Sequence, residues 1–404
     1  MYIDRHLEKV ILNATKSFPV VLVTGPRQVG KTTLLEKLAD KERKYITLDN
    51  PIIRELAVSD PAIFIQRYQP PVIIDEIQYA PELLPYIKMY VDEHKNKGDF
   101  WLTGSQMFHL MKNVSESLAG RVAVISMLGL SSNEIEGLPN TPFKPDTGIL
   151  FEKIKHAVSK NVNEIFARIL KGSMPALYQN EQDLEMYYSS YVNTYLQRDI
   201  RDLAQVGDEL TFLRFMTACA ARTSQMVNYA DLAKDVGISP PTAKQWLSIL
   251  VSSGIIALVE PYFNNALKRI IKSPNMYFLD TGLCAYLTRW TSSETLEVSA
   301  MSGAFFETYV VSEIVKSYYN AGKRPPIFYY RDSDNKEIDI IVEQDNTLYP
   351  IEIKKSGSPK RDAARHFDVL KKTGKSIGTG CVICLCSDLL PVDKNNYFVP
   401  VWLI

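Results

Sequence analysis

A glycine-rich stretch near the amino terminus, VVLVTGPRQVGKTTLL, has the residue types and spacing of a phosphate-binding loop. It begins with an apolar run at Val20 that predicts a buried strand, and it leads into an amphipathic helix. Its two glycines let backbone N–H groups approach phosphate oxygens, its lysine can reach β and γ phosphates, and its first threonine offers a hydroxyl to Mg²⁺. A chance turn is the alternative, but strand, loop and helix all fall where the motif requires them. We expect ATP and Mg²⁺ to bind at Gly25, Pro26, Arg27, Gln28, Val29, Gly30, Lys31, Thr32 and Thr33.

Acidic and small polar residues end two later predicted strands. The run PPVIID ends in Asp75, which Glu76 follows, and the run DFWLTGS ends in Ser105. In an open parallel sheet, ligands bind at the carboxyl ends of the strands. We expect Asp75 to help hold Mg²⁺, Glu76 to orient or deprotonate the attacking water, and Ser105 to act as a γ-phosphate sensor. A solvated strand cap would also explain two acids, but behind the phosphate loop they predict hydrolysis, with Lys31 and Glu76 as catalytic residues.

Arg121, in the run LAGRV, lies between a turn of small residues and a predicted strand. A guanidinium in this place could reach the nucleotide of a neighbouring subunit and stabilise transition-state charge. That role would require a homo-oligomer. A surface or interdomain salt bridge is an equally good interpretation.

The order of the motifs GPRQVGKT, VIIDEIQ, WLTGS and LAGR resembles that of prokaryotic AAA-superfamily ATPases with an uncharacterised C-terminal domain. The resemblance covers essentially the whole chain. It implies nucleotide binding by the loop, metal and water roles for Asp75 and Glu76, a sensor role for Ser105, and a finger role for Arg121.

A second set of charged residues is spread over the last hundred residues. Glu307 lies within the apolar face of a predicted helix, Asp339 lies on a predicted strand, and Glu352 alternates with Lys354 on the next strand. This order is similar to the PD-(D/E)xK nuclease core. The resemblance implies that Asp339 and Glu352 hold Mg²⁺, that Lys354 positions or polarises the attacking water, and that all four residues serve phosphodiester cleavage. A solvated strand face explains Glu352 and Lys354 more simply, and the fold also occurs as a binding scaffold.

Residues 208–280 predict a winged helix-turn-helix. Ser239 is a suitable N-cap before Pro240, and the following helix has Thr242, Lys244 and Gln245 on its exposed face. The predicted wing adds basic residues, namely Lys268, Arg269 and Lys272. This module suits duplex DNA, but winged helices also serve as lids and oligomer contacts in ATPases.

Composition limits the remaining classes. The 404 residues include 46 Lys and Arg and 46 Asp and Glu, so any DNA-binding surface must be regional. The sequence has no apolar stretch of membrane-spanning length, which predicts a cytoplasmic protein without membrane contact. Five cysteines without paired knuckles or nearby histidines predict buried strand residues.

We therefore expect an α/β protein with a P-loop NTPase core containing a parallel sheet, a helical and winged-helix module, and an α/β restriction-endonuclease-like domain. In that last domain we expect a helix over Asp362–Lys372. The expected limits are 1–140 for the AAA-type core, 141–207 for a helical linker or lid, 208–280 for the winged helix, and 281–404 for the nuclease-like domain. The expected function is Mg²⁺-dependent ATP hydrolysis coupled to DNA engagement or cleavage. The alternative is a regulatory ATP switch whose nuclease-like domain is a non-catalytic scaffold.

Overall fold

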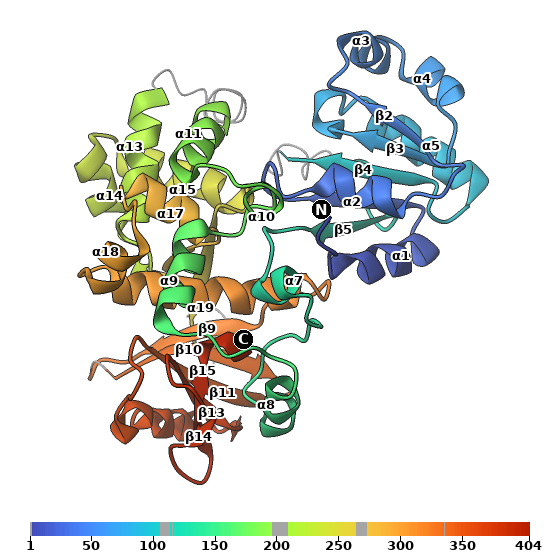
Figure 1. Ribbon diagram of the computed structural model, residues 1–404. Helices are drawn as coiled ribbons and strands as arrows, with labels where there is room; N and C mark the ends of the chain where they lie inside the picture. Colours follow the sequence, from blue (N-terminus) through green and yellow to red (C-terminus); the bar gives the residue numbers. More distant parts are fainter. Residues whose placement is uncertain (1, 106–113, 115, 196–208, 264–272, 335) are drawn as a thin grey trace.

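The computed structural model describes the whole chain except residues 1, 106–113, 115, 196–208, 264–272 and 335. Figure 1 shows three parts in chain order: a blue N-terminal lobe, a green to yellow helical region, and an orange to red sheet region that contains the C-terminus. No helix among the described residues is long and apolar enough to cross a membrane.

A five-stranded parallel sheet with the order β2-β3-β4-β1-β5 forms the centre of the N-terminal lobe. Its strands are β1 (Val20–Thr24), β2 (Lys44–Thr47), β3 (Val72–Asp75), β4 (Phe100–Gly104) and β5 (Val122–Ser126). Every residue of β1, β3 and β4 is buried, as expected for parallel strands with both faces covered. The expected parallel-sheet α/β core is confirmed.

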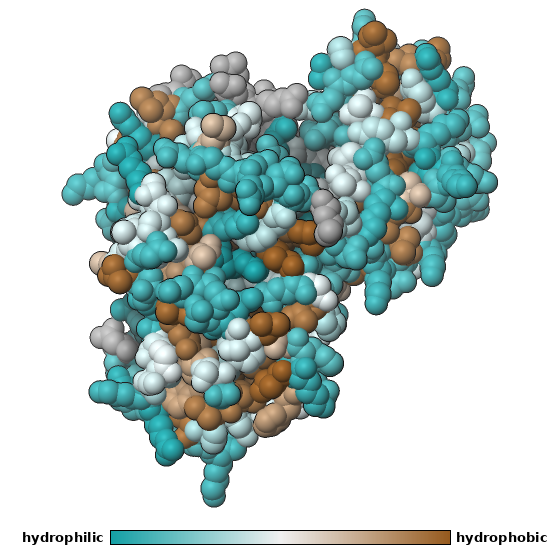
Figure 2. Space-filling view, viewed as in Figure 1, coloured by the Kyte–Doolittle hydropathy of each residue, from teal (hydrophilic) through white to brown (hydrophobic). Residues whose placement is uncertain are grey.

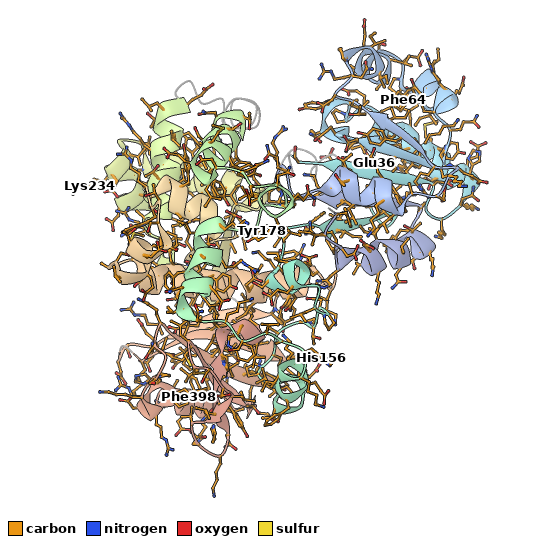
Figure 3. All side chains as sticks on the ribbon, in the orientation of Figure 1. Glu36, Phe64, His156, Tyr178, Lys234 and Phe398 are labelled. Carbon is orange, nitrogen blue, oxygen red and sulfur yellow. The ribbon has the colours of Figure 1, made fainter. Side chains whose placement is uncertain are left out.

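Helices cover both faces of this sheet. They are α1 (Leu7–Ser17), α2 (Lys31–Leu38), α3 (Pro51–Ser59), α4 (Pro61–Arg67) and α5 (Leu83–His94). Leucines of α1 and α2 pack with Val21 and Val23, whereas Phe64 of α4, labelled in Figure 3, packs with Val20 and Leu22 on the other face. Alternate residues of β1 therefore belong to two different cores. On the outside, Figure 2 shows apolar side chains over α3 and α4, where Ile52 and Ile63 are exposed.

The helical region follows the N-terminal lobe. Its helices are α7 (Ser132–Glu136), α8 (Thr147–Ile154), α9 (Val162–Lys171), α10 (Ala176–Gln179), α11 (Leu184–Tyr195), α13 (Glu209–Ala220), α14 (Tyr229–Val236), α15 (Pro240–Ser252), α17 (Thr281–Leu287), α18 (Ser293–Val298) and α19 (Ser302–Tyr319). Tyr178 on α10, labelled in Figure 3, donates a hydrogen bond from its hydroxyl to the Gly172 carbonyl, 2.6 Å away. Helix α17 packs on α9 and α13, and α18 packs on α9. The segment that contains α17 and α18 therefore lies with the helices that precede it.

Three helices and a small sheet occupy the segment expected to form a winged helix. Helices α13, α14 and α15 are followed by the antiparallel strands β7 (Ile256–Pro261) and β8 (Asn275–Phe278), and β6 (Gln225–Met226) pairs with β8. Ser239 caps α15, since its Oγ accepts the Thr242 N–H at 3.2 Å. Lys244 and Gln245 are exposed on α15. The expected basic wing residues, Lys268, Arg269 and Lys272, lie outside the described residues.

The C-terminal strands continue the same sheet. They are β9 (Ile327–Arg331), β10 (Glu337–Gln344), β11 (Thr347–Lys354), β12 (Ser376–Ile377), β13 (Gly380–Cys384), β14 (Leu390–Pro391) and β15 (Asn396–Pro400). Strand β9 pairs with β7, so β6 to β15 form one ten-stranded sheet.

The segment between β11 and β12 differs from the expectation. The helix expected over Asp362–Lys372 is instead two 3₁₀ segments, η3 (Arg361–Ala364) and η4 (Phe367–Thr373). They lie against the sheet, where Phe367 and Leu370 pack with Phe398 of β15, labelled in Figure 3. Close tertiary packing of these apolar residues replaces the longer helix.

Candidate functional site

The loop between β1 and α2 has a backbone that only glycine fits at two positions. Gly25 has a φ of 140°, and a Cβ atom there would lie 2.0 Å from the Met127 carbonyl oxygen. Gly30, with a φ of 92°, is the N-cap of α2. Helix α2 therefore begins directly at the loop, with its N-terminal N–H groups directed into it, which is the arrangement that binds phosphate.

Lys31 lies inside this loop. Its Nζ donates to the carbonyl oxygens of Gly25 at 3.1 Å and of Pro26 at 2.7 Å. A pocket of about 730 Å³ opens beside it, lined by Arg27, Gln28, Gly30, Lys31, Thr32, Thr33, Glu76 and Thr194. Val29 points the other way and is buried in the core. Most of the predicted loop residues line the pocket. Gly25 and Val29 instead pack against the rest of the lobe.

Asp75, the last residue of β3, accepts hydrogen bonds from several hydroxyl groups. Thr32 Oγ1 and Thr103 Oγ1 each lie 2.6 Å from Asp75 Oδ1, and the Tyr45 hydroxyl lies 3.1 Å from Oδ2. Hydroxyl and carboxylate oxygens are the hard donors that Mg²⁺ prefers. Thr32 and Asp75 therefore fit the expected Mg²⁺, and they are the residues that would hold it.

Glu76 lies at the mouth of the same pocket in the left-handed region, with a φ of 59°. Its N–H donates to Thr103 Oγ1 at 3.0 Å. Its carboxylate accepts a hydrogen bond from the Gln78 amide and one from Ser105 Oγ at 3.4 Å. Ser105 therefore contacts the side chain of Glu76. Gln78 was missed by the sequence prediction, although it lies only two residues beyond the acidic pair.

Arg5 is a second residue that the sequence prediction missed. It is 5% exposed, and it donates from Nη1 to the Val29 carbonyl at 2.7 Å, from Nη2 to the Leu128 carbonyl at 2.8 Å, and from Nε to Glu134 Oε1 at 2.9 Å. Burial alone would raise the pKa of Glu134, but Arg5 and nearby N–H donors hold that pKa below its usual value. Arg5 thus fixes the back of the phosphate loop.

Residues from the helical region complete the nucleotide pocket. The Tyr187 hydroxyl on α11 donates to Gln28 Oε1 at 2.8 Å, and Thr194 on the same helix lines the pocket. A Cβ atom at Gly254 would come within 3.0 Å of Pro26. The phosphate loop is therefore in contact with structure far beyond the N-terminal lobe. Arg198 and Arg201, further along the chain, lie outside the described residues.

Arg121 lies away from the nucleotide pocket of its own chain. Strands β1 and β5 are parallel with Val20 opposite Val122, so Arg121 is at the amino end of the sheet and the loop is at the carboxyl end. Its Nε and Nη2 donate to the two carboxylate oxygens of Asp92 at 2.5 and 2.9 Å. Contact with a neighbouring subunit stays a prediction.

The C-terminal sheet contains a second candidate site. Asp339 of β10 and Glu352 and Lys354 of β11 line a pocket of about 580 Å³. Lys354 Nζ lies 2.6 Å from Glu352 Oε1 and 4.0 Å from Asp339 Oδ2, and the Ile353 N–H donates to Asp339 Oδ2 at 2.7 Å. Three residues with basic side chains also line this pocket, namely Lys360, Arg365 and His366.

Glu307 of α19 accepts a hydrogen bond from the Tyr277 hydroxyl at 2.8 Å. Burial, together with the charge of Asp339, raises the pKa of Glu307 to about 8 and that of Glu352 to about 7. Glu352 Oε2 is buried and has no hydrogen-bond partner. The structure thus brings together the acids of a helix and two strands with one lysine. Within the described ranges, no group of three or more His, Cys, Asp and Glu side chains is arranged to hold a metal ion.

Comparison with known proteins divides the chain into three segments, roughly as the fold does. Residues 17–136 match the family model described as an AAA domain, residues 162–294 match a domain of unknown function (DUF8612), and residues 302–404 match another (DUF4143). Residues 17–136 are therefore similar to AAA-superfamily ATPase domains, and residues 302–404 are similar to the DUF4143 domain. The AAA match supports ATP binding and hydrolysis by the N-terminal lobe.

Two uncharacterized proteins, of Mycobacterium tuberculosis and Mycobacterium bovis, are each 29% identical to this chain over 346 residues, which covers 84% of this chain and 71% of theirs. Among solved structures, the Walker-type ATPase PABY2304 of Pyrococcus abyssi is similar with a TM-score of 0.44 and 17% identity, over 71% of this chain and 96% of that one. RuvB T158V of Thermotoga maritima has a TM-score of 0.29 and 18% identity, over 62% and 86%.

Proposed function

We propose that the protein is an Mg²⁺-dependent ATPase that couples ATP hydrolysis in the N-terminal lobe to DNA engagement by its later domains. One observation carries the ATPase assignment: Lys31, Thr32 and Glu76 line a single pocket, and Asp75 is hydrogen-bonded to Thr32 at its edge. Backbone N–H groups of the loop and Lys31 bind the phosphates. Thr32 and Asp75 would hold Mg²⁺, which would supply positive charge to the phosphates.

In this mechanism Glu76 orients or deprotonates the attacking water. Its hydrogen bonds with Ser105 and Gln78 restrict its carboxylate, and Glu76 lines the same pocket as the loop residues. Ser105 then acts through Glu76 as well as on the γ-phosphate. The hydrogen bond between Tyr187 and Gln28 gives the helical region a direct contact with the loop. A change in the loop on nucleotide binding can therefore be transmitted to the later domains.

The domain limits that we propose follow the packing. We propose that the AAA-type core ends near residue 140 and that a winged helix spans residues 208–280, in which α15 presents Lys244 and Gln245 to solvent. Because α17 and α18 pack on α9 and α13, we move the start of the last domain from residue 281 to about residue 300. The exposed face of α15 is the surface of the winged helix that suits duplex DNA.

For the last domain we propose a PD-(D/E)xK nuclease-like fold that binds the phosphate backbone of DNA. The convergence of Glu307, Asp339, Glu352 and Lys354 supports it, as do the basic residues that also line the pocket. Asp339 and Glu352 would hold a divalent cation, and the unpartnered Glu352 Oε2 is an oxygen suited to it. Lys354 would position the attacking water.

The alternative is a regulatory ATP switch whose nuclease-like domain holds a partner without cleavage. The close ion pair between Lys354 and Glu352 favours this alternative, because it already neutralises one of the two carboxylates. The absence of a three-ligand metal cluster among the described residues favours it too.

A paired assay tests both assignments. Wild type, Lys31→Ala and Lys354→Ala proteins are compared for phosphate release and for nicking of plasmid DNA with Mg²⁺ or Mn²⁺. Lys41→Ala, an exposed lysine after α2, is the matched control. We expect Lys31→Ala alone to abolish phosphate release and Lys354→Ala to abolish nicking. Phosphate release from Lys31→Ala at the wild-type rate would contradict the ATPase site. ATPase activity without nicking by any preparation would favour the switch.

A further inference from the structure

The two candidate sites are joined through a series of buried and partly buried contacts that begins at the phosphate loop. Arg5 binds the Val29 carbonyl of the loop with one nitrogen and Glu134 of α7 with another. Arg5 is 5% exposed and Glu134 is 3% exposed. Separating a buried charge pair leaves an uncompensated charge and is strongly unfavourable. The back of the loop and α7 are therefore expected to move together.

The start of α7 is in turn bonded to the middle and the C-terminal end of α19. The Ser132 N–H donates to Glu313 Oε2 at 2.7 Å, and Ser132 Oγ lies 2.8 Å from the Tyr309 hydroxyl. Asn320 Nδ2 donates to Ser131 Oγ at 3.2 Å. Figure 1 shows α7 between the N-terminal lobe and α19. These contacts fix α7 to α19 at several points.

The same helix α19 also carries Glu307. Glu307 precedes Glu313 by six residues, about 9 Å along a helix axis. Helix α19 packs on β11, which carries Glu352 and Lys354. Because a helix moves as a stiff rod over this length, a shift at Tyr309 and Glu313 displaces Glu307 relative to the two strands.

We infer that α7 and α19 transmit nucleotide-dependent movement of the phosphate loop to Glu307, so that ATP binding alters the packing around Asp339 and Glu352. This inference rests on the proposed function of the N-terminal lobe. A rival route runs through Tyr187 and Gln28, but that hydrogen bond is exposed to solvent, which competes for both groups. The route through α7 runs through the buried bonds of Arg5 and the partly buried bonds of Ser132, so water competes for it less.

Hydrogen exchange followed by mass spectrometry tests this coupling in the full-length protein. Exchange is measured with and without Mg²⁺ and a non-hydrolysable ATP analogue, and analogue affinity is measured separately by titration. In wild type, the analogue should change exchange in residues 302–319 and 347–354. Tyr309→Phe and Ser132→Ala each remove the Ser132–Tyr309 bond from one side. Each variant should lose at least half of that change and bind the analogue within about threefold of wild type.

Tyr329→Phe is the matched control. Tyr329 is as buried as Tyr309, and its hydroxyl donates to the Ser273 carbonyl at 2.7 Å, away from α7. This control should keep the full exchange change. An equal change in all the variants would overturn the coupling, as would no change in wild type with the analogue bound. Failure of wild type to bind the analogue would overturn the proposed ATPase and the coupling with it, and the titration identifies that case.

Discussion

The nucleotide pocket and the C-terminal carboxylate pocket surround their acids in opposite ways. Asp75 accepts hydrogen bonds from the hydroxyls of Thr32, Thr103 and Tyr45, all of them neutral donors. Glu352 lies beside Asp339, and its positively charged neighbour is Lys354. The first pocket therefore holds its acid in place before any ligand arrives. The second pocket places carboxylates close together, so a bound proton or cation is needed to offset their mutual repulsion.

The difference extends to where the residues come from. The nucleotide pocket is built mainly from one loop and the ends of adjacent parallel strands. The acids of the carboxylate site come from α19, β10 and β11, and α19 is separated from these strands along the chain. The following predictions test this contrast, beginning with the largest expected effect.

Glu76→Gln should reduce phosphate release at least about 100-fold, because an amide cannot accept the proton of the attacking water. Analogue affinity should stay within about threefold, since Glu76 is not part of the phosphate-binding loop. Steady-state phosphate release and analogue titration measure the two effects. Glu82→Gln, an exposed acid in the same segment, should behave as wild type. If Glu76→Gln releases phosphate at the wild-type rate, Glu76 is not the residue that activates water. The first pocket would then lack the preorganised catalytic acid that distinguishes it from the second.

Arg5→Met should lower the free energy of unfolding by about 3 kcal/mol, because it leaves Glu134 charged and buried without its partner. Urea denaturation of the full-length protein measures this change. Lys9→Met, an exposed lysine on α1, should change stability little. A small effect of Arg5→Met would mean that the nucleotide lobe does not depend on a buried charge pair at all.

The pH dependence of stability should differ between the two pockets because of Glu307. Its pKa is about 8 in the folded protein and 4.5 as a free side chain, so between these values the folded state binds more protons than the unfolded state. Stability should therefore fall as pH rises from about 4.5 to 8. Glu307→Gln should match wild type near pH 5 and exceed its melting temperature by a few °C at pH 8.

Thermal melts from pH 5 to pH 9 measure this effect, with the exposed Glu181→Gln as control. A Glu307→Gln protein that is less stable than wild type at pH 8 would indicate a charged and well-partnered Glu307. The two pockets would then resemble one another more closely than we expect.

Arg121→Ala should have the smallest effect. Its ion pair with Asp92 is at the surface, where such pairs contribute little, so the melting temperature should change by less than about 2 °C. Phosphate release by dilute protein should stay within twofold, because Arg121 lies at the far end of the sheet from its own loop. A large loss of hydrolysis that occurs only at concentrations where chains associate would identify Arg121 as a finger acting in a neighbouring subunit.

Sequence motifs indicated a candidate site where its residues are neighbours along the chain, and the structure places most of them around one pocket. The residues from Gly25 to Thr33 and the pair Asp75 and Glu76 are short motifs, and the parallel sheet follows from apolar runs between them. Arg5 could not be found in this way, because its partners Val29 and Glu134 lie far along the chain and no motif links them. The contact of Tyr187 with Gln28 was missed for the same reason.

The C-terminal region shows a second limit. The order of Glu307, Asp339, Glu352 and Lys354 indicated a shared site, and the structure brings them together. Their burial and raised pKa values depend on the packing of α19 against the sheet, which no local pattern records. Tertiary packing also decided that residues 361–373 form 3₁₀ segments, and that α17 and α18 lie with the preceding helices.

The pairing of β7 with β9 limits where this protein can be truncated or fused to another domain. Family models divide the chain between residues 294 and 302, yet Glu260 and Pro261 pair with Phe328 and Tyr329 across that division. A fragment that starts at the division would expose the edge of β9, an open template for aggregation. The middle and last segments therefore share one sheet, and a graft or truncation should keep β7 and β9 together.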